Sequence, residues 1–505
     1  MQKVNLKKIP LTPKELVFGF QHMFAMLGAT VLVPILSNMS ISMALLAAGI
    51  GTIVFYFITK KKVPVFLGSS FAFLPALQAI LGKTDPETGA FLLERYGIEW
   101  QNAMAAVCIS LVLAGLVYVA LAVVIKTVGV QKVKKLFPPI VVGPVIIIIG
   151  MILAPKMFYN NIIGPAMWNG VDAWKEWTTA IVTALVIVIV NAYAKPKSFL
   201  KVIPILLGFA AGYVYAFAIS FAPGGSLLSF IVQENGKFAA FDLGKAFSAD
   251  RIILFQNIGK EFSFYKGFAN MTGATFGTAA LMIVPLAIVT FMEHLGDISA
   301  NSTVCGKDFM VDPGLHRTVM GDGIATALSG LLGGPANTTY GENTAVLAIT
   351  QNYSTKNIFI AACLAAVFGL FTVFADFLAT IPAAVIGGAS IILFGMISAS
   401  GLRAMVEGKV DFGNTKNLMV VSITLAIGLG LGAMSLAGDV TGNAAFKIKA
   451  GDVEISPLAI ATVLAIVLNL IIPDSKPRNE EELEGKINLT SDAVDVEEIA
   501  KEEEK

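Results

Sequence analysis

Residues 337–343 read Asn-Thr-Thr-Tyr-Gly-Glu-Asn and begin an apolar run, 337–351, that is short and carries polar residues. A second short run, 63–80, holds Leu-Gly-Ser-Ser-Phe-Ala-Phe at positions 67–73. A helix that crosses a membrane needs roughly 20 mostly apolar residues, so neither run is typical of an uninterrupted span. Non-helical backbone survives at membrane depth only where protein or a polar cavity satisfies its hydrogen bonds. The two runs therefore indicate broken segments of a membrane protein.

The composition of the whole chain agrees with a membrane location. Of 505 residues, 56% are apolar and only 14% are charged, and the mean hydropathy is +0.76. A soluble domain usually carries about 25% charged residues, and surface-to-volume scaling leaves most of its residues near water. Soluble, disordered and nucleic-acid-binding proteins are excluded, and we predict an all-α polytopic membrane protein.

Apolar runs of spanning length recur along the chain and join the two short runs in a regular series. A polar stretch, 223–270, divides the series into seven and seven. The fourteen predicted segments are 16–37, 41–59, 63–80, 102–125, 137–154, 178–194, 202–222, 276–298, 318–333, 337–351, 357–379, 381–400, 417–436 and 457–473.

Short motifs of the first half recur in the same order in the second half. The pairs are 20–23 with 292–295, 68–70 with 341–343, and 137–143 with 381–387. An odd number of spans in each half would invert the second half relative to the first. We therefore predict a 7+7 inverted repeat, an architecture of secondary transporters whose substrate site lies near the midplane, where short interrupted segments correspond.

The distribution of charge predicts the orientation in the cell membrane. Lys and Arg are more frequent in the loops that are cytoplasmic if the N-terminus is inside, which is the usual bias. Both termini are then cytoplasmic. The tail, 474–505, carries 12 acids and 5 bases and is typical of a solvated appendage. No cleavable signal peptide is apparent, because the first 14 residues are polar and basic.

Charged side chains inside or at the edges of the predicted spans are all acidic. An ionised residue at the bilayer centre costs at least ~2.5–3.5 kcal/mol, so such residues usually face a cavity and mark a substrate or proton path. No Lys or Arg is expected nearby in the spans to pair with them. The five acids are Glu293, Asp297, Asp322, Glu342 and Asp376.

Glu293 and Glu342 stand out because they occupy the repeat-related motifs. Asp297 follows Glu293 by four residues and shares its helix face. Burial raises the pKa of a carboxyl group, so the group can take up a proton on one side of the membrane and release it on the other. It accepts hydrogen bonds when ionised and also donates one when protonated. These properties suit the transport of a neutral substrate that is coupled to a proton gradient. Asp322 either braces a helix or acts in function, and Asp376 is expected to be solvated beside a loop.

Several motifs together resemble the nucleobase–ascorbate (nucleobase–cation symporter 2) family. The run Asn337–Asn343 resembles the family signature, and its Gly-Glu-Asn form resembles the uracil permease branch. The resemblance covers nearly the whole chain. It includes the motifs Gln21-His22, Gly28–Pro34, Leu67–Phe73, Glu293-His294 and Asp312–Arg317.

The resemblance implies a fold, an assembly and a division of the chain. It implies fourteen spans with short strands in broken segments 3 and 10, a homodimer, and a core domain that moves against a gate domain. The expected parts are a cytoplasmic segment (1–14), core (15–126 and 271–379), gate (127–222 and 380–473), an extracytoplasmic connection (223–270) and the cytoplasmic tail (474–505).

The resemblance also implies a substrate and a set of site residues. The expected activity is proton-coupled uracil import, with H⁺ as coupling ion and no cofactor or metal. The carboxylates of Glu293 and Glu342 would bind pyrimidine N–H groups, and the backbone amides of Phe71 and Gly341 would bind its carbonyl oxygens. The remaining candidates are Ala29 and Tyr340 (pocket lining), Asp297 and His294 (proton coupling), and Asp322, His22, Asn343 and Phe394 (secondary).

The chain departs from the family pattern at a few positions. Asp297 replaces an expected His, Ala345 a Gly, Gln351 a basic residue and Phe394 a pocket Tyr. Because some relatives carry xanthine or urate, and Asp322 resembles an acid of purine carriers, a purine–proton symporter is the alternative.

Other classes of membrane protein fit the sequence less well. An embedded enzyme would need a metal or nucleophile motif, and the three cysteines, Cys108, Cys305 and Cys363, lack metal-binding spacing. An anion exchanger would be expected to carry a neutral or basic residue at Glu342. Broken segments with titratable acids suit a closed, alternating site better than a channel.

Overall fold

The structure is a computed structural model, and part of the chain lies outside the residues that it describes. The expected N-terminal segment, up to residue 12, and the acidic tail, 474–505, are among the parts outside. The described residues are 13–84, 91–129, 131–132, 135, 137–164, 171–195, 198–234, 237–242, 258–441, 443–446, 448–450 and 453–473.

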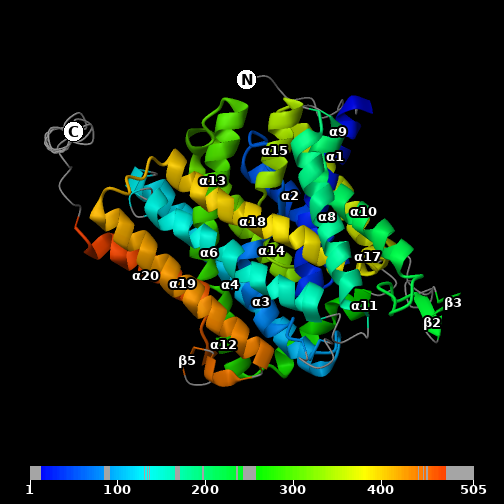
Figure 1. Cartoon of the computed structure of the whole chain (residues 1–505). Helices are drawn as coiled ribbons and strands as arrows, with labels where there is room; N and C mark the ends of the chain where they lie inside the picture. Colours follow the sequence, from blue (N-terminus) through cyan, green and yellow to red (C-terminus); the bar gives the residue numbers. More distant parts are fainter. Residues whose placement is uncertain are drawn as a thin grey trace, which may run out of the picture.

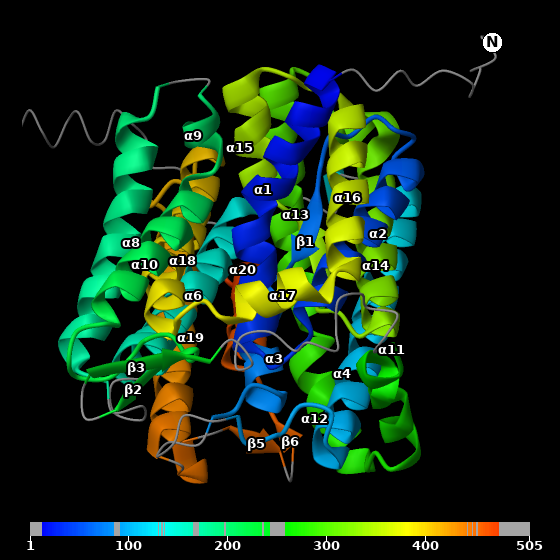
Figure 2. The same ribbon diagram turned by 90° about the vertical axis from the view of Figure 1, so that its right-hand side faces the viewer.

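The described chain is almost entirely helical, and its long helices run side by side (Figure 2). Apolar residues surround most of them, as expected for helices that meet either other helices or lipid. The main helices are α1 (Pro13–Leu36), α2 (Ile41–Ile58), α4 (Ile98–Val128), α6 (Pro139–Phe158), α8 (Ala173–Tyr193), α10 (Pro204–Ile219), α12 (Gly273–Ile283), α13 (Leu286–Cys305), α14 (Leu315–Leu332), α16 (Thr355–Leu370), α18 (Ala383–Glu407), α19 (Thr415–Thr441) and α20 (Pro457–Ile471).

Shorter elements connect these helices or interrupt them. Two hairpins, β2–β3 and β5–β6, lie at the same end of the molecule (Figure 2). The short elements are β1 (Leu67–Ser69), η1 (Phe71–Phe73), α3 (Leu74–Ile80), η2 (Tyr159–Ile163), α9 (Phe199–Val202), β2 (Ile231–Glu234), β3 (Lys237–Phe241), α11 (Ile258–Glu261), η5 (Phe262–Ala269), η6 (Met310–Gly314), β4 (Asn337–Thr339), α15 (Gly341–Thr350), α17 (Thr372–Ala379), η7 (Ala444–Phe446), β5 (Lys449–Ala450) and β6 (Val453–Glu454).

The chain is a multi-pass membrane protein by the length and apolarity of its helices. Among the described residues, eight helices could cross a membrane, or nine if α16 and α17 count as one span. Those two helices are bent by 81° at a break, although the sequence predicts one span over 357–379. Each of the other predicted segments coincides with a helix or a broken segment, and the count of fourteen spans stays a prediction.

The helices pack in two groups, each joined by small residues that let backbones approach. In the first group α14 packs on α4 and α2, and α16 packs on α2 and α1. In the second, α18 packs on α6 and α8, α10 packs on α8, and α19 packs on α6 and α20. A Cβ atom added to Gly115 would lie 2.4 Å from the Gly323 carbonyl oxygen, so the contact of α4 with α14 requires glycine.

The two broken segments meet as a pair of strands inside the first group. Strand β1 pairs with β4 in antiparallel register, with Leu67 opposite Thr339 and Ser69 opposite Asn337. The Ser70 amide continues the ladder by donating to the Ala336 carbonyl at 2.9 Å. All six strand residues are buried, so the pairing satisfies backbone groups where no water is available.

The strands align the two halves differently from the sequence motifs. The first residues of β1 and β4 are 270 positions apart (337 minus 67), whereas the motifs at 68–70 and 341–343 predict an offset of 273. Ser70 and Tyr340 are the residues that precede the following helices. Phe71 and Gly341 therefore occupy corresponding positions, because each begins a helix and is separated from its strand by a single residue.

Side chains of neighbouring helices hold both strands in place. The Thr52 hydroxyl of α2 donates to the Leu67 carbonyl at 3.2 Å and accepts from the Leu67 amide at 2.9 Å. The Thr326 hydroxyl of α14 donates to the Asn337 carbonyl at 2.7 Å, and the Asn337 amide group donates to the Ala47 carbonyl at 2.8 Å. The strand pair is thus fixed to α2 and α14.

We predict that Gly68→Ala destabilises the protein, because the added Cβ would lie 2.5 Å from Cζ of the Tyr340 ring and 2.7 Å from the Thr30 hydroxyl. Overpacking of this kind costs about 1–3 kcal/mol. The measurement is the thermal unfolding temperature of the purified protein in detergent. Gly395→Ala on α18, where nothing lies within 4 Å, is the matched control; equal Tm values for the two variants would contradict the prediction.

Candidate functional site

Three carboxyl groups gather beside the strand pair. Glu293 and Asp297 lie one turn apart on α13, and Glu342 lies in the first turn of α15, which packs against α13. Their charges are close enough to act on one another. All three side chains are half-buried, while Gly341 next to them is exposed. The structure therefore brings the main predicted site residues together around an accessible point.

The Asp297 carboxylate is anchored to strand β4. It accepts a hydrogen bond of 2.9 Å from the Thr339 hydroxyl. Its other oxygen lies 3.4 Å from the position that a Cβ atom would take on Gly341. Glycine at this position keeps the start of α15 open toward the carboxylates.

His294 and Asp322 form a fully buried pair that joins α13 to α14. The His294 Nδ1 lies 2.9 Å from Asp322 Oδ2, and its Nε2 lies 2.9 Å from the Thr318 hydroxyl. The same Asp322 oxygen accepts from the Thr339 amide at 3.4 Å. Both side chains have zero exposure. Of the two interpretations of Asp322, the structure gives it a bracing position, one contact away from Asp297.

His22 and Asn343 make a second buried link, between α1 and α15. The Asn343 side-chain amide donates to the His22 carbonyl at 3.1 Å and lies 3.3 Å from His22 Nδ1. Both residues are at most 1% exposed. This link holds α15, and with it Glu342, against α1.

The residues expected to line the pocket lie between α1 and the strands. The Tyr340 hydroxyl donates to the Ser69 carbonyl at 2.7 Å and accepts from the Thr30 hydroxyl at 3.4 Å. Ala29 and Tyr340 are both buried, with 0% and 4% exposure. The Tyr340 ring fills the space left by Gly68, so it closes one side of the strand pair.

Phe71 and Phe394 connect the two groups of helices. Their rings meet edge to face, with centroids 5.6 Å apart, and both side chains are buried. Phe394 thus lies against the residue that begins η1 but makes this contact from α18, in the second group. An aromatic residue at position 394 covers one side of the strand-to-helix turn.

Each of the two strands is followed by the start of a helix. The first N–H groups of a helix have no partner within that helix, and Phe71 and Gly341 are the first residues of η1 and α15. Because the strands are antiparallel, the two helices leave the pair in opposite directions. The arrangement offers N–H donors from two helix starts and carboxylate acceptors from Glu293 and Glu342.

The helices also contain charged residues that lie outside the predicted spans. Lys156 lies in α6, and Lys175 and Glu176 lie in α8 with 0% and 2% exposure. These helices extend beyond the apolar runs that were used to place the spans. Asp376, expected to be solvated, is instead half-buried in α17. Among the described residues, no group of three or more His, Cys, Asp or Glu could hold a metal ion.

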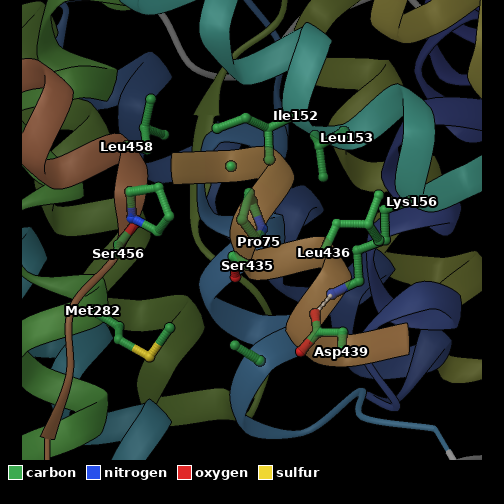
Figure 3. Close-up of a pocket in the computed structure, with 13 residues that line it drawn as sticks. Pro75, Ile152, Leu153, Lys156, Met282, Ser435, Leu436, Asp439, Ser456 and Leu458 are labelled. Carbon is green, nitrogen blue, oxygen red and sulfur yellow. Dashed lines mark hydrogen bonds and ion pairs between the residues drawn. The ribbon is translucent and has the colours of Figure 1, made fainter. Parts of the chain in front are cut away.

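Figure 3 shows a small cavity that is separate from the carboxylates. It lies between α3 and α12 on one side and α6, α19 and α20 on the other. Lys156 and Asp439 form an ion pair of 3.0 Å on its wall (Figure 3). Its volume of about 40 Å³ has room for a few water molecules, far below the roughly 300–1,000 Å³ of ordinary ligand pockets.

Three polar residues that support the site were missed in the sequence. Thr339 and Thr318 contact the predicted acids and histidine, and Asn301 donates to the Pro64 carbonyl at 3.3 Å and to the Thr344 hydroxyl at 3.2 Å. Thr318 precedes Asp322 by four residues, so helical spacing could have identified it. Asn301 gives no such signal, because its partners are distant in the chain.

Comparison with known proteins assigns the family. A sequence model of xanthine/uracil permeases, described as "Permease family", matches residues 13–436. The chain belongs to the xanthine/uracil permease family. The "Uracil permease" of Bacillus caldolyticus is 37% identical over 483 residues, covering 95% of this chain and 96% of the relative. The "Uracil permease" of Escherichia coli (strain K12) is 32% identical over 469 residues, covering 93% of each. As a member of this family the chain is a membrane transport protein and not an enzyme.

Solved structures show that the permease shares its fold with more distant transporters. The transmembrane domain of the cyanobacterial bicarbonate transporter BicA superposes with a TM-score of 0.51 at 15% identity, covering 91% of this chain and 97% of that one. The murine anion transporter Slc26a9 in its inward-facing state gives 0.53 at 10% identity, covering 92% and 69%. At such low identity these similarities concern the fold alone.

We predict that Asp322→Asn destabilises this permease. Asn keeps an oxygen that can accept from His294 and the Thr339 amide, but its NH2 group would replace Oδ1, which is buried and has no partner among the described residues. A buried donor without a partner costs about 1–3 kcal/mol. Thermal unfolding of the purified protein measures the effect. Asp411→Asn, in an exposed loop, is the control, and an Asp322→Asn protein that unfolds at the control's temperature would contradict a bracing role.

Proposed function

We propose that this permease imports uracil by proton symport across the cell membrane. The observation that carries the proposal is the meeting of Glu293 and Glu342 with the helix starts at Phe71 and Gly341. Uracil carries N–H donors and carbonyl acceptors on one small ring. Carboxylates that accept and backbone amides that donate would match both kinds of group, and the names of the similar relatives agree with this substrate.

The contacts around the carboxylates support a proton path in the same place. In our proposal, Glu293 exchanges a proton with Asp297, whose carboxylate is bonded to Thr339 of the strand pair. His294 keeps Asp322 and α14 fixed beside this path. A proton taken up by these acids removes negative charge near the substrate, so substrate and proton would bind in a coupled manner.

The two groups of helices support an alternating mechanism. We propose that the group around α1–α4 and α12–α17 is the core domain and that α6–α10 and α18–α20 form the gate domain, with the boundaries expected from the sequence. The core would carry the substrate past the gate, with Phe71 and Phe394 parting as it moves. The proposal includes fourteen spans as a 7+7 inverted repeat, cytoplasmic termini and a homodimer.

A purine such as xanthine or urate is the second candidate substrate. Asp322, the acid that resembles one of purine carriers, lies beside the site. Its Oδ2 atom is bonded to His294 and its Oδ1 atom has no partner among the described residues, but the side chain has zero exposure, so in this structure a larger ring cannot reach it. This burial favours uracil over the purine.

We predict that Glu342→Gln lowers uracil uptake at least about tenfold, because a hydrogen bond to a charged group contributes about 1.5–3 kcal/mol. The measurement is uptake of radiolabelled uracil into proteoliposomes with an imposed pH gradient. Unlabelled xanthine and sulfate serve as competitors. Wild-type uptake should rise with an inward proton gradient; uptake that ignores the gradient, or normal transport by Glu342→Gln, would refute the mechanism.

The control separates substrate binding from general damage. Glu94→Gln, at a position that is exposed outside the helices, should leave uptake unchanged. Competition by xanthine but not by uracil would establish the purine alternative instead. Competition by sulfate would identify an anion carrier.

We predict that Asp297→Asn uncouples transport from pH while substrate binding remains. Asn keeps an oxygen that can accept the Thr339 hydrogen bond but cannot take up a proton. Uracil binding is measured by calorimetry on the purified protein, and coupling by the dependence of uptake on the pH gradient. Unchanged coupling in the variant would remove Asp297 from the proton path.

A further inference from the structure

A second buried acid lies far from the carboxylates of the proposed transport site. Glu176 is in the first turn of α8, is 2% exposed, and its Oε2 atom has no hydrogen-bond partner among the described residues. The transport mechanism does not use it. An ionisable residue inside a membrane helix usually faces a partner or an ion, because an isolated charge there is costly.

Two further oxygens near Glu176 also lack partners among the described residues. They are the Thr179 hydroxyl, on the next turn of α8, and the Asn161 side-chain carbonyl, in the π-helical turn η2. Thr179 has 0% and Asn161 5% exposure. Buried polar atoms are nearly always hydrogen-bonded or bound to water or an ion, so three such atoms in one region require an explanation.

The packing of three elements brings the residues that carry these oxygens to one junction. Glu176 and Thr179 belong to the buried stripe of α8, and α8 packs against both η2 and α18. A Cβ atom on Gly388 would lie 2.3 Å from the Ala180 carbonyl, and one on Gly387 would lie 3.2 Å from the Asn161 Cβ. Adjacent glycines at the start of α18 therefore touch α8 on one side and η2 on the other. Figures 1 and 2 both show α8 beside α18.

Side-chain cations of the described chain do not occupy this junction. The neighbouring Lys175 ammonium group donates instead to the carbonyls of Ala222 and Gly225, at 2.7 and 2.6 Å. Helix α10 carries no charged residue, and the charges of α18, Arg403 and Glu407, lie at its other end. The remaining titratable groups of the packed elements are Asp172 before α8, Tyr193 of α8, Lys156 of α6 (paired with Asp439), Tyr159 of η2, Tyr213 and Tyr215 of α10, and Lys201 of α9.

We propose that Glu176, Thr179 and Asn161 form a cation-binding site, for a proton or a sodium ion, within the second group of helices. All three unpartnered atoms are oxygens that can accept, and a bound cation would supply the partner that each of them lacks. Carboxylate, hydroxyl and amide oxygens are the ligands of hard cations. The site lies apart from Glu293 and Glu342, so it stands whether or not uracil is the substrate.

The test compares the thermal stability of the purified full-length protein with that of Glu176→Gln, in sodium chloride or choline chloride and over a range of pH. A ligand that binds the folded state stabilises it, so a sodium site should raise the wild-type Tm by about 2–4 °C in sodium. A proton site should instead give a wild-type Tm that falls as the pH rises, because the bound proton is then lost. Glu176→Gln should lose whichever response the wild type shows.

Matched variants keep the outcome clear. Glu99→Gln removes an exposed acid from the first turn of α4. It therefore changes the charge near a helix N-terminus, as Glu176→Gln does, but leaves the proposed site intact. Its Tm should respond to sodium and pH as that of the wild type does. Thr179→Val removes one oxygen at similar shape, and it replaces Glu176→Gln in the comparison if that variant does not fold. Equal responses of the wild type and the site variant to both sodium and pH would overturn the proposal and leave an ordered water in the junction.

Discussion

The pairing of β1 with β4 is the interaction on which the rest of this structure depends. Backbone at membrane depth must find hydrogen-bond partners inside the protein, and neither short segment can supply its own. Each strand supplies them to the other across 270 residues (337 minus 67). The partners of the strands, Thr52 of α2 and Thr326 of α14, then have to lie close by, which fixes those helices around the pair.

The same constraint explains where the proposed site lies. A strand that ends inside the membrane must be followed by a helix start, and a helix start has free N–H groups and a positive end. Glu342, in the first turn of α15, is an acid at such a positive end. Glu293 and Asp297 reach this place from α13, and Thr339 ties Asp297 to the strand itself. A broken segment therefore leaves backbone N–H groups without a partner, with carboxylates beside them. In our proposal these are the groups that bind the substrate and the proton.

Much of this arrangement was predictable because its signals are local. Two short apolar runs with glycine and polar residues predict broken segments, and acids in apolar surroundings predict a polar site. The strand register was not predictable from the motifs, which align Gly68 with Gly341, while the structure aligns Phe71 with Gly341. The register depends on hydrogen bonds to distant helices, and these leave no trace in the spacing of nearby residues.

Two other differences have physical causes of the same kind. The bend after Leu370 was missed because no proline lies between residues 357 and 379. Gly369 does not mark the bend either, because its tight contact with α2 is a sufficient reason for glycine there. Glu176 was missed because it precedes the apolar run 178–194, so the sequence places it outside the membrane span. In the structure α8 begins earlier, at Ala173, and the part of the helix that holds Glu176 packs against η2 and α18. Hydropathy reports which residues tolerate lipid, but the ends of helices are set by packing against neighbours. Charges at those ends can therefore be as buried as the acids at the centre of the protein, and they need partners for the same reason.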